Sequence, residues 1–401
     1  MKRIVFVGAG LAAVSTCDAL RSLGYDGRLV LLSAEAGLPY DRPPLSKDVL
    51  LGKAGRDGIP LRPASWYEQQ GVELRTGTRV TALRPQGGSV QTADGTSVLG
   101  DRVVLATGGT PRALPVPGGD DPAVHLLRTW EEAERLRARL LPGTHVAVVG
   151  AGLIGAETAS AAVTLGCQVT LIDPVPLPLA PVVGVAVATA LRRQQSEAGI
   201  ELVTGGVERI QHRPGRALVH ISGRDDPLAV DTVVVGIGIR PSTALAEASG
   251  LSTADGIVVD ACRRSSHPAV YAVGDAARRH EQPTRHEHWD AAQRDGRAAA
   301  IGLLGEAPEA ERATWFWSDR HGSRLEAAGT MAEANRLVLR GSADSSAFTV
   351  FGLHDDRLVA AAAIDRARDI ATARRLIDRA VPLDASRLAD ETADPRTLLR
   401  N

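Results

Sequence analysis

The sequence predicts an α/β protein with two nucleotide-binding units and a smaller C-terminal α+β module. The stretch "RIVFVGAGLAAVSTCDALRSLG" (3–24) is an apolar strand, a glycine turn and an alanine-rich helix, and "RLVLLS" follows as a second strand. The same order of elements recurs in "HVAVVGAGLIGAETASAAVTLG" (145–166), which is followed by "QVTLID". From about residue 310 the strands no longer end in glycine, so a different module is expected there.

Composition narrows the class of protein. A chain of 401 residues with 44% hydrophobic and 23% charged residues is typical of a soluble globular protein of two or three domains. A formal net charge of −1 gives no general attraction to nucleic acid or to membranes. The apolar stretch after "MKR" breaks at "GAG", too early for a secretion signal, and no apolar run is long enough to span a bilayer. A cytoplasmic location is therefore expected.

The three cysteines, Cys17, Cys167 and Cys262, are widely separated and form no CxxC pair. We expect inert thiols, and neither a metal site nor a redox-active dithiol. Aromatic residues make up only 3% of the chain, so "WFW" (315–317) is a local concentration. It is interpreted either as core packing or as the wall of a site.

Several later segments read as strands. "DRVVLATGG" (101–109), "DTVVVGIGIRP" (231–241) and "AVYAVGDAA" (269–277) are apolar and end in glycine, as strands of a parallel sheet flanked by helices do. "RLVLRGS", "AFTVFGL" and "RLVAAAAI" predict short strands of the C-terminal module. The polar tail beyond about residue 385 is expected to be poorly ordered.

The first glycine motif follows a strand directly and precedes a helix. Its glycines let the backbone approach a pyrophosphate, which then lies on the unpaired amides of the helix N-terminus. The alternative is a turn that only allows tight packing of helix on strand. The motif residues are Gly8, Gly10, Leu11, Ala12 and Ala13.

The second motif predicts a second dinucleotide site, and Asp173 ends the strand that follows it. A carboxylate there accepts hydrogen bonds from both ribose hydroxyls and repels a 2′-phosphate, which favours NADH over NADPH. Alternatively, Asp173 is a solvated residue at a strand end. In the first unit Glu35 is the candidate for the equivalent role, with a register uncertain by one residue. The residues of the second motif are Gly150, Gly152, Leu153, Ile154 and Gly155.

The segment "PYDRPPLSK" (39–47) disfavours both helix and strand, because prolines remove amide donors and restrict their neighbours. The residues that follow it, "DVLLG", are compatible with the start of a helix. The chain has three lysines, Lys2, Lys47 and Lys53, so a lysine at the end of this rigid segment is conspicuous.

Together, the two nucleotide folds and the motifs "LATGGTPR", "GIGIRP", "YAVGDAA", "PYDRPPLSK", "EHW" and "FWSD" resemble the FAD-dependent ferredoxin reductases of oxygenase systems. The resemblance covers roughly residues 3 to 385. It implies the glutathione-reductase fold, with two Rossmann-like dinucleotide-binding domains. The implied division is an FAD-binding domain of residues 1–109 and 234–310, an NAD-binding domain of 110–233 and a C-terminal α+β domain of 311–401.

The resemblance also implies which residues line FAD. Asp275 would bind the ribityl chain, and the alternative role for it is a helix N-cap. Trp289 would lie against the flavin at the start of a helix whose dipole stabilises negative charge on the reduced ring, or it would serve only in packing. Arg128 is alternatively a surface arginine. The other positions that match the FAD site are Ala12, Arg42, Val80, Ala106, Thr107, Gly108 and Gly274. Gly236 and Gly238 of "GIGIRP" are further cofactor-binding candidates.

Lys47 and Glu157 are the catalytic candidates. By the resemblance, the proline turn would bring Lys47 to the flavin N5 edge, and Glu157 would pair with it. A carboxylate partner keeps a buried lysine charged and fixed in place. The alternative is a purely structural salt bridge.

The function that the resemblance implies is hydride transfer from NADH to FAD, followed by transfer of single electrons to a small iron-sulfur ferredoxin that feeds an oxygenase. The alternatives are an NADH oxidase or disulfide reductase, a rubredoxin as acceptor, and a non-enzymatic flavoprotein of the apoptosis-inducing-factor type. Three departures from the family stand out. "PVPLPLAPVV" lacks the arginines usual after Asp173, Ser242 replaces asparagine, and Arg320 and His321 replace glutamine and tyrosine.

Overall fold

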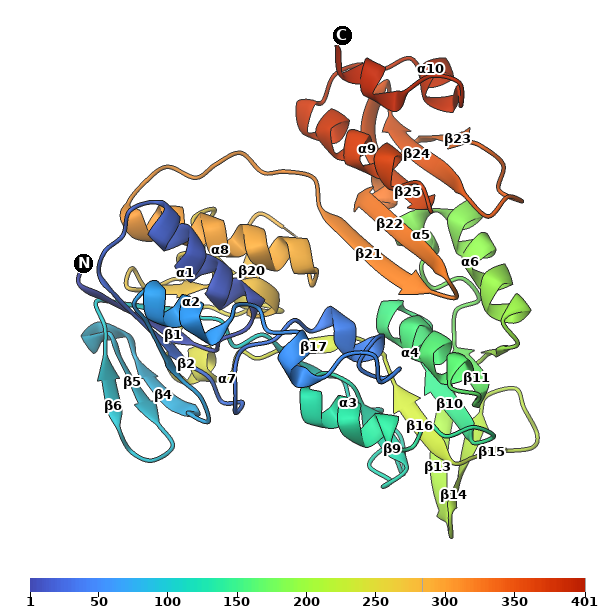
Figure 1. Ribbon diagram of the computed structural model, residues 1–401, viewed down its shortest axis with the longest axis horizontal. Helices are drawn as coiled ribbons and strands as arrows, with labels where there is room; N and C mark the ends of the chain where they lie inside the picture. Colours follow the sequence, from blue (N-terminus) through green and yellow to red (C-terminus); the bar gives the residue numbers. More distant parts are fainter. Residues whose placement is uncertain (283, 401) are drawn as a thin grey trace. The chain divides into compact units, whose positions relative to one another are not determined.

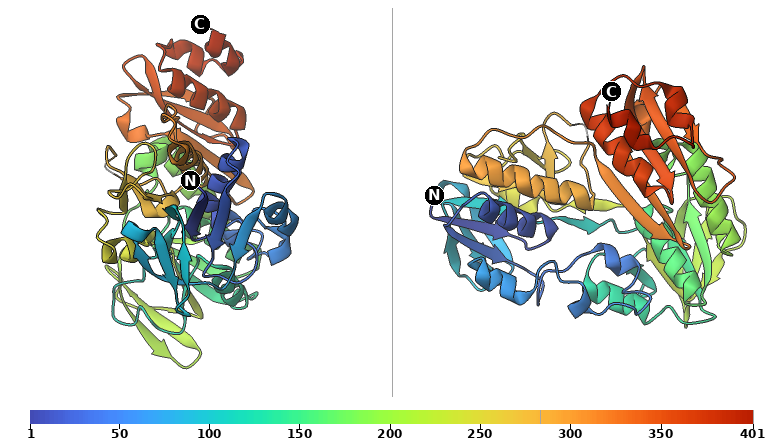
Figure 2. Two further views of the ribbon diagram at one scale, coloured as in Figure 1. Left: turned by 90° about the vertical axis from the view of Figure 1, so that its left-hand side faces the viewer. Right: turned by 45° about the horizontal axis from the view of Figure 1, so that its top comes forward.

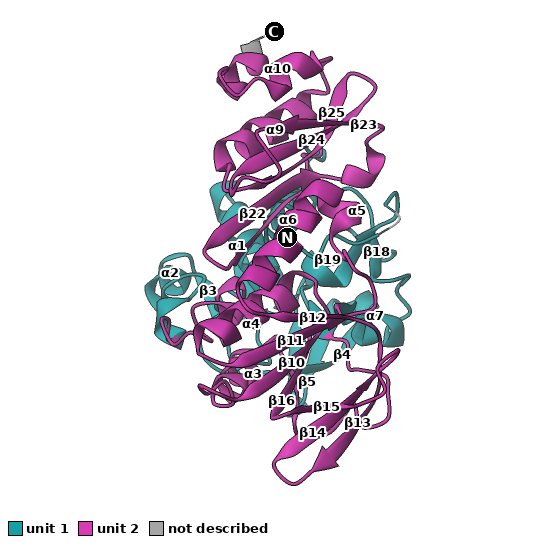
Figure 3. Ribbon diagram, turned by 90° about the vertical axis from the view of Figure 1, so that its right-hand side faces the viewer, with its two compact units in different colours: residues 1–41, 56–110, 239–310 teal, residues 42–55, 111–238, 311–401 magenta. Residues whose placement is uncertain are grey.

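The computed structural model describes residues 1–282 and 284–400. The chain forms two compact units, each assembled from segments that are distant in the sequence (Figure 3). Unit 1 comprises Met1–Asp41, Arg56–Thr110 and Ile239–Ala310, and unit 2 comprises Arg42–Gly55, Pro111–Gly238 and Glu311–Asn401. Residues 42–47 of "PYDRPPLSK", which include Lys47, thus belong to unit 2. The expected division into three domains stays a prediction.

Unit 1 is built on a parallel five-stranded sheet in the order β19-β7-β1-β2-β3. Its main elements are β1 (Arg3–Val7), α1 (Leu11–Ser22), β2 (Arg28–Leu32), α2 (Ala64–Gln69), β3 (Val72–Arg75), β4 (Val80–Arg84), β5 (Ser89–Thr92), β6 (Ser97–Leu99), β7 (Arg102–Leu105), β8 (Gly109–Pro111), β17 (Ile239–Pro241), α7 (Ala244–Ala248), β18 (Ile257–Val259), β19 (Val270–Ala272), the 3₁₀ turn η4 (Gly274–Ala276), β20 (Ala277–Arg279) and α8 (Trp289–Leu304). Helices α1 and α8 run side by side against the sheet (Figure 1).

Both faces of this sheet are buried, which explains its continuous apolar strands. Ile4 and Phe6 of β1 belong to the core formed with α1 and α8. Val5 and Val7, which point the other way, belong to the core on the opposite face, which includes residues of β4, β5 and β6. Successive side chains of a strand alternate between faces, so each strand contributes to both cores.

Unit 2 contains the second nucleotide fold, a parallel sheet in the order β12-β11-β10-β16-β9. Its elements are β9 (Val124–Leu126), α3 (Trp130–Arg137), β10 (His145–Val149), α4 (Leu153–Thr164), β11 (Gln168–Asp173), α5 (Ala180–Val183), α6 (Val185–Glu197), β12 (Glu201–Thr204) and β16 (Thr232–Val235), with an antiparallel sheet of β13 (Val207–Arg213), β14 (Arg216–Ile221) and β15 (Leu228–Val230).

The C-terminal part of unit 2 is an antiparallel sheet in the order β21-β22-β25-β24-β23. Helix α9 covers one of its faces (Figure 2), and residues of α5 and α6 pack on the other. The elements are β21 (Trp315–Arg320), β22 (Ser323–Gly329), β23 (Arg336–Arg340), β24 (Phe348–His354), β25 (Arg357–Ile364), α9 (Ala367–Arg379), α10 (Ala385–Ala389) and the 3₁₀ helix η6 (Pro395–Arg400). The predicted fold class, α/β with a C-terminal α+β part, is confirmed.

Two local predictions are wrong. Pro43–Ser46 forms a short 3₁₀ helix, because prolines at its first positions need no amide partner, whereas "DVLLG" forms turns rather than a helix. The described tail, residues 386–400, is not poorly ordered, because it contains the end of α10 and all of η6. Leu388 and Leu398 are buried there, and Arg340 donates hydrogen bonds to three carbonyl groups of the tail.

Among the residues that the structure describes, no helix combines the length and the apolar character needed to cross a membrane.

We expect Leu398→Ala to lower the free energy of unfolding by about 2–5 kcal/mol, because it empties a buried site in the C-terminal core. Urea unfolding followed by tryptophan fluorescence measures the effect. Leu337→Ala, at a side chain that is 55% exposed, is the control and should change little. Equal stability of Leu398→Ala and wild type would mean that the tail does not pack.

Candidate active site

The residues predicted to bind FAD gather at one edge of the sheet of unit 1. Strands β1, β2, β7 and β19 are parallel, so their carboxyl ends meet there. The backbone amide of Gly8 donates to the Leu32 carbonyl at 2.8 Å, and that of Ala106 donates to the Val7 carbonyl at 2.9 Å. The amide of Val273 donates to the Leu105 carbonyl. The glycine turn and the motifs "LATGG" and "VGD" therefore lie along one edge.

The first glycine turn fits a pyrophosphate. Gly8 has φ +105°, and a Cβ there would lie 2.2 Å from the Ala106 carbonyl oxygen, so this position requires glycine. A Cβ at Gly10 would meet no described atom within 4 Å, which leaves open space in front of the turn. Helix α1 begins at Leu11, and in the described chain no side chain caps it. Its first amides remain available to an anion.

Asp275 lies within η4, and the N-cap position of that turn is Val273. The alternative interpretation of Asp275 as a helix N-cap is therefore wrong. The backbone amide of Gly274 donates to Oδ2 of Asp295 in α8 at 3.0 Å, which fixes the turn. Burial lowers the pKa of the nearby His288 to about 4, and Asp275 opposes this shift. His288 is therefore neutral at pH 7.

Trp289 is the first residue of α8, and its indole Nε1 donates to Oδ1 of Asp41 at 2.9 Å. This bond fixes the indole at the helix N-terminus, whose positive dipole end favours negative charge nearby. Asp41 lies within "PYDRPPLSK" but was not among the predicted site residues.

Other predicted FAD residues have defined partners in unit 1. The carboxylate of Glu35 accepts a hydrogen bond from the Tyr40 hydroxyl at 2.5 Å. The Thr107 hydroxyl donates to the Ser242 carbonyl at 2.7 Å, and the Ser242 amide donates to the Gly108 carbonyl at 2.9 Å. Since its backbone makes these contacts, Ser242 can replace asparagine without breaking the turn. Ala12, Ala13 and Val80 lie in α1 and β4.

Arg42 and Arg128 lie together in unit 2, whereas the other predicted FAD residues lie in unit 1, except Lys47. The guanidinium of Arg42 donates to the Arg128 carbonyl. The amide of Arg128 donates to Glu132 at 2.8 Å, beside the capping box that Thr129 and Glu132 form at the start of α3. These contacts fix the guanidinium of Arg42 and the backbone of Arg128.

The second glycine turn repeats the geometry of the first in unit 2. Helix α4 begins at Leu153 with Gly152 at the N-cap, and a Cβ on Gly152 would meet no described atom within 4 Å. A Cβ at Gly155 would lie 1.9 Å from the Gly150 carbonyl oxygen, so the third glycine permits close packing of helix and strand. Ile154 is 44% exposed on the first turn. The turn therefore fits a second pyrophosphate.

Asp173 and the segment that contains Gly236 and Gly238 complete this second site. Oδ2 of Asp173 accepts from the Ala151 amide at 2.8 Å, and Oδ1 accepts from the Val175 amide at 2.9 Å. The carboxylate is thus held beside the turn. The Gly236 amide donates to the Val149 carbonyl at 2.8 Å, and the Gly238 carbonyl accepts from the Arg112 amide at 2.9 Å.

Lys47 and Glu157 form an ion pair in unit 2. Nζ of Lys47 lies 3.0 Å from Oε1 of Glu157, whose side chain is only 3% exposed. Glu157 lies on α4 and also accepts hydrogen bonds from the hydroxyls of Ser46 and Ser318. These three donors, together with the lysine's charge, compensate the cost of burying the carboxylate. Their catalytic role stays a prediction.

Two side chains of β21 complete the surroundings of Lys47. Oδ2 of Asp319 lies 3.7 Å from Nζ, and the Trp317 ring lies 5.8 Å from it, in cation–π range. Phe316 points the other way, into the C-terminal core. The "WFW" segment therefore serves both as core and as a wall beside the lysine. Ser46 and Ser318 were not predicted, although the quoted "LSK" and "FWSD" contain them.

The described chain has two nucleotide folds, and in each the glycine turn precedes a helix N-terminus that no side chain caps. This arrangement is typical of proteins that bind two dinucleotides. The chain belongs to the pyridine nucleotide-disulphide oxidoreductase family, whose model matches residues 2–296, and the reductase C-terminal model matches residues 315–399.

Its relatives include the anthranilate 1,2-dioxygenase system ferredoxin–NAD(+) reductase component of Burkholderia cepacia, which is 40% identical over 98% of both chains. Rhodocoxin reductase of Rhodococcus erythropolis is 34% identical over 98% of this chain and 93% of the relative. The structure also matches a chain of the covalent putidaredoxin reductase–putidaredoxin complex, with a TM-score of 0.93, 33% identity and coverage of 100% and 98%. The resemblance to ferredoxin reductases is confirmed.

We expect Asp173→Ala to weaken NADH binding about tenfold, because the ribose loses a charged acceptor. NADPH binding should change less, since the variant also loses a repulsive charge. Titration calorimetry with each nucleotide measures both, and Asp225→Ala, at an exposed aspartate, is the control. Equal weakening of both nucleotides would contradict the assignment of Asp173.

Proposed function

We propose that this chain takes a hydride from NADH onto FAD and passes single electrons to a small iron-sulfur ferredoxin that feeds an oxygenase. The observation that carries the proposal is similarity along the whole chain to the named ferredoxin–NAD(+) reductase component. The chain is an FAD-dependent NADH:ferredoxin oxidoreductase, as the sequence predicted. FAD and NADH are its cofactors and a ferredoxin is its partner.

Bound FAD supplies the chemistry, because it accepts two electrons as a hydride and releases them one at a time. The chain's own residues bind the two dinucleotides and orient them. The turns at Gly8–Ala13 and Gly150–Gly155 offer helix amides to the two pyrophosphates. We assign Asp275 to the ribityl chain, Trp289 to the flavin, and Asp173 to the ribose of NADH.

Lys47 is the residue to which we assign charge stabilisation during hydride transfer. A fixed ammonium group next to the flavin N5 edge would stabilise the negative charge that develops on the ring. The ion pair with Glu157 supports this role, because it holds the ammonium group of Lys47 in one position. A salt bridge with only a structural role is the alternative that the variants below distinguish.

The cysteines give no support to a thiol mechanism. Burial raises the pKa of Cys17 and of Cys167, and burial together with Asp260 raises that of Cys262. A raised pKa disfavours the thiolate, which is the reactive form. This argues against the disulfide reductase alternative. We include a cytoplasmic location in the proposal, and three free thiols are typical of a reducing compartment.

We expect Lys47→Met to slow flavin reduction by NADH about tenfold or more while NADH affinity changes little, because the charge acts on the transition state. Stopped-flow absorbance at several NADH concentrations separates the two parameters. Lys53→Met, at the exposed lysine of the same segment, is the matched control. An unchanged reduction rate in Lys47→Met would mean that the ion pair of Lys47 and Glu157 has only a structural role.

The proposed function predicts that the reduced enzyme is reoxidised faster by ferredoxin than by rubredoxin, oxygen or a disulfide. Stopped-flow reoxidation with these acceptors tests it. A variant with all three cysteines replaced by alanine or serine, and shown to be folded, should keep nearly full ferredoxin reduction. Loss of activity in that variant would favour a thiol mechanism, and faster reaction with oxygen would favour an oxidase.

A further inference from the structure

Arg320, the last residue of β21, points into unit 2 on the same face as a contact of Glu157. Buried and half-buried positions alternate along β21, so Phe316, Ser318 and Arg320 share the buried face of the strand. Phe316 packs there against residues of α6, and the Ser318 hydroxyl donates to Oε1 of Glu157 at 2.8 Å. Arg320 follows Ser318 by two residues, so its side chain enters the same region.

The turn after β21 holds Arg320 in this position. His321 and Gly322, with φ +51° and +74°, form the two-residue turn that joins β21 to β22. The His321 amide donates to Oγ of Ser160 at 2.8 Å. Ser160 follows Glu157 by three residues on α4, so the two side chains are neighbours on the helix surface. The strand is thus attached to α4 both before and after Arg320.

The guanidinium of Arg320 is a buried charge. Arg320 is 4% exposed, and its Nε and Nη2 have no hydrogen-bond acceptor within the described residues. Burial lowers the pKa of Arg320 to about 10, and the charge of Glu157 opposes this shift. The guanidinium is therefore charged at pH 7. A buried charge of this kind needs an opposite charge nearby, and Glu157 supplies it.

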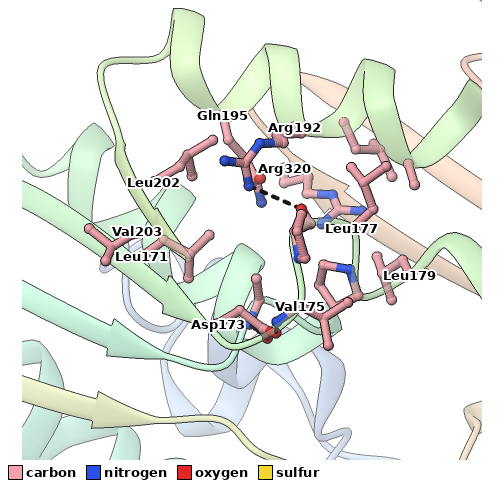
Figure 4. A pocket seen from close by; sticks show the side chains of 15 residues that line it. Leu171, Asp173, Val175, Leu177, Leu179, Arg192, Gln195, Leu202, Val203 and Arg320 are labelled. Atoms are coloured by element: carbon pink, nitrogen blue, oxygen red, sulfur yellow. Dashed lines mark hydrogen bonds between the residues drawn. The ribbon is translucent and has the colours of Figure 1, made fainter. Parts of the chain in front are cut away.

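Other side chains near Arg320 do not take the place of Glu157. Figure 4 shows Arg320 in the wall of a pocket of unit 2, with Asp173 at the opposite end. Asp173 forms no ion pair with Arg320 in the described part of the chain, and its oxygens accept backbone amides. Arg192 lines the same pocket and is itself a cation. Burial and Arg320 lower the pKa of His321 to about 4, so this neighbour is neutral at pH 7.

Arg320 changes the balance of charge around Lys47. Nζ of Lys47 lies 3.0 Å from a carboxylate oxygen of Glu157 and 3.7 Å from one of Asp319. Nε of Arg324 lies 3.4 Å from the other oxygen of Asp319. The two carboxylates and the two cations of this group cancel, so Arg320 gives it one positive charge in excess. Its charge is buried, so water and salt screen it less than they screen the exposed Arg324.

We propose that Arg320 supports hydride transfer through Glu157, as a positioning residue, by leaving the charge of the Lys47 ammonium group uncancelled, which makes bound FAD easier to reduce. The inference rests on the proposed function, in which Lys47 lies next to the flavin N5 edge. A carboxylate 3.0 Å from an ammonium group cancels much of its field, and a second cation beside that carboxylate restores it. The reduced flavin is the more negative form, so a positive excess stabilises it.

The midpoint potential of bound FAD, measured by spectroelectrochemistry on the full-length protein without nucleotide, tests this inference. A contact of Arg320 with NADH cannot affect that measurement. We expect Arg320→Gln to shift the equilibrium about tenfold toward oxidised FAD, which is about 30 mV for a two-electron couple. Arg320→Met, a second neutral variant, should show the same shift, whereas Arg320→Lys keeps the charge and should stay within about twofold of wild type.

Arg193→Gln is the matched control for the loss of a positive charge in unit 2. Arg193 lies on α6, where its guanidinium contacts Ala343 and Asp344 and not Glu157. This variant should leave the potential of FAD unchanged.

Urea unfolding of the same FAD-loaded variants tests whether Glu157 is the counter-ion of Arg320. Glu157→Gln leaves the buried guanidinium without its opposite charge, whereas the same substitution in Arg320→Gln does not. We therefore expect Glu157→Gln to lower the urea midpoint less than half as far in the Arg320→Gln background as in wild type.

An unchanged potential in both neutral variants would overturn the inference. An equal shift in Arg320→Lys would also overturn it, because packing and not charge would then be the cause. Equal effects of Glu157→Gln on stability in both backgrounds would remove Glu157 as the counter-ion. Failure of NADH to reduce the FAD of wild type would instead count against the proposed function.

Discussion

The candidate active site of unit 2 depends on the hydrogen bonds and the ion pair that the buried carboxylate of Glu157 makes. It accepts hydrogen bonds from Ser46 and Lys47 in the proline segment and from Ser318 in β21. One side chain of α4 thus joins two segments that are distant in the sequence. Removal of one member of a buried pair costs about 3–5 kcal/mol, because the other charge stays buried. The arrangement fixes Lys47 more strictly than an exposed salt bridge would.

The rigidity of the proline segment adds to this constraint. The 3₁₀ helix Pro43–Ser46 places Ser46 and Lys47 on adjacent positions that both reach Glu157. Prolines lower the conformational freedom of the unfolded segment, so less entropy is lost when the lysine is positioned. Trp317 and Asp319 limit the lysine on its other sides.

Much of this architecture follows from local sequence. The two strand-turn-helix units were predictable because the whole pattern of each unit, an apolar strand, a glycine turn and a helix, lies in one short continuous stretch of sequence. Gly8 and Gly155 are required by steric contacts with the adjacent backbone, and such requirements leave a readable motif. The pair of Lys47 and Glu157 came from the family resemblance, since no local pattern links residues so far apart.

What escaped prediction depends on contacts over long sequence separations. Ser318 meets Glu157, and Arg320 meets the loop after Asp173, only because β21 packs against α4 and this loop. The ordered tail was missed because its few apolar residues, Leu388 and Leu398, show no clear period. Arg340 holds this tail through carbonyl groups, which carry no sequence signal at all.

The central claim is that Glu157 acts in hydride transfer through Lys47. A double-mutant cycle on the rate constant of flavin reduction by NADH tests this claim most directly, using Lys47→Met, Glu157→Gln and the double variant. The account predicts that the double variant is as slow as Lys47→Met alone, within about twofold, because residues that act as a unit are not additive. Independent, multiplicative losses from the two substitutions would contradict it.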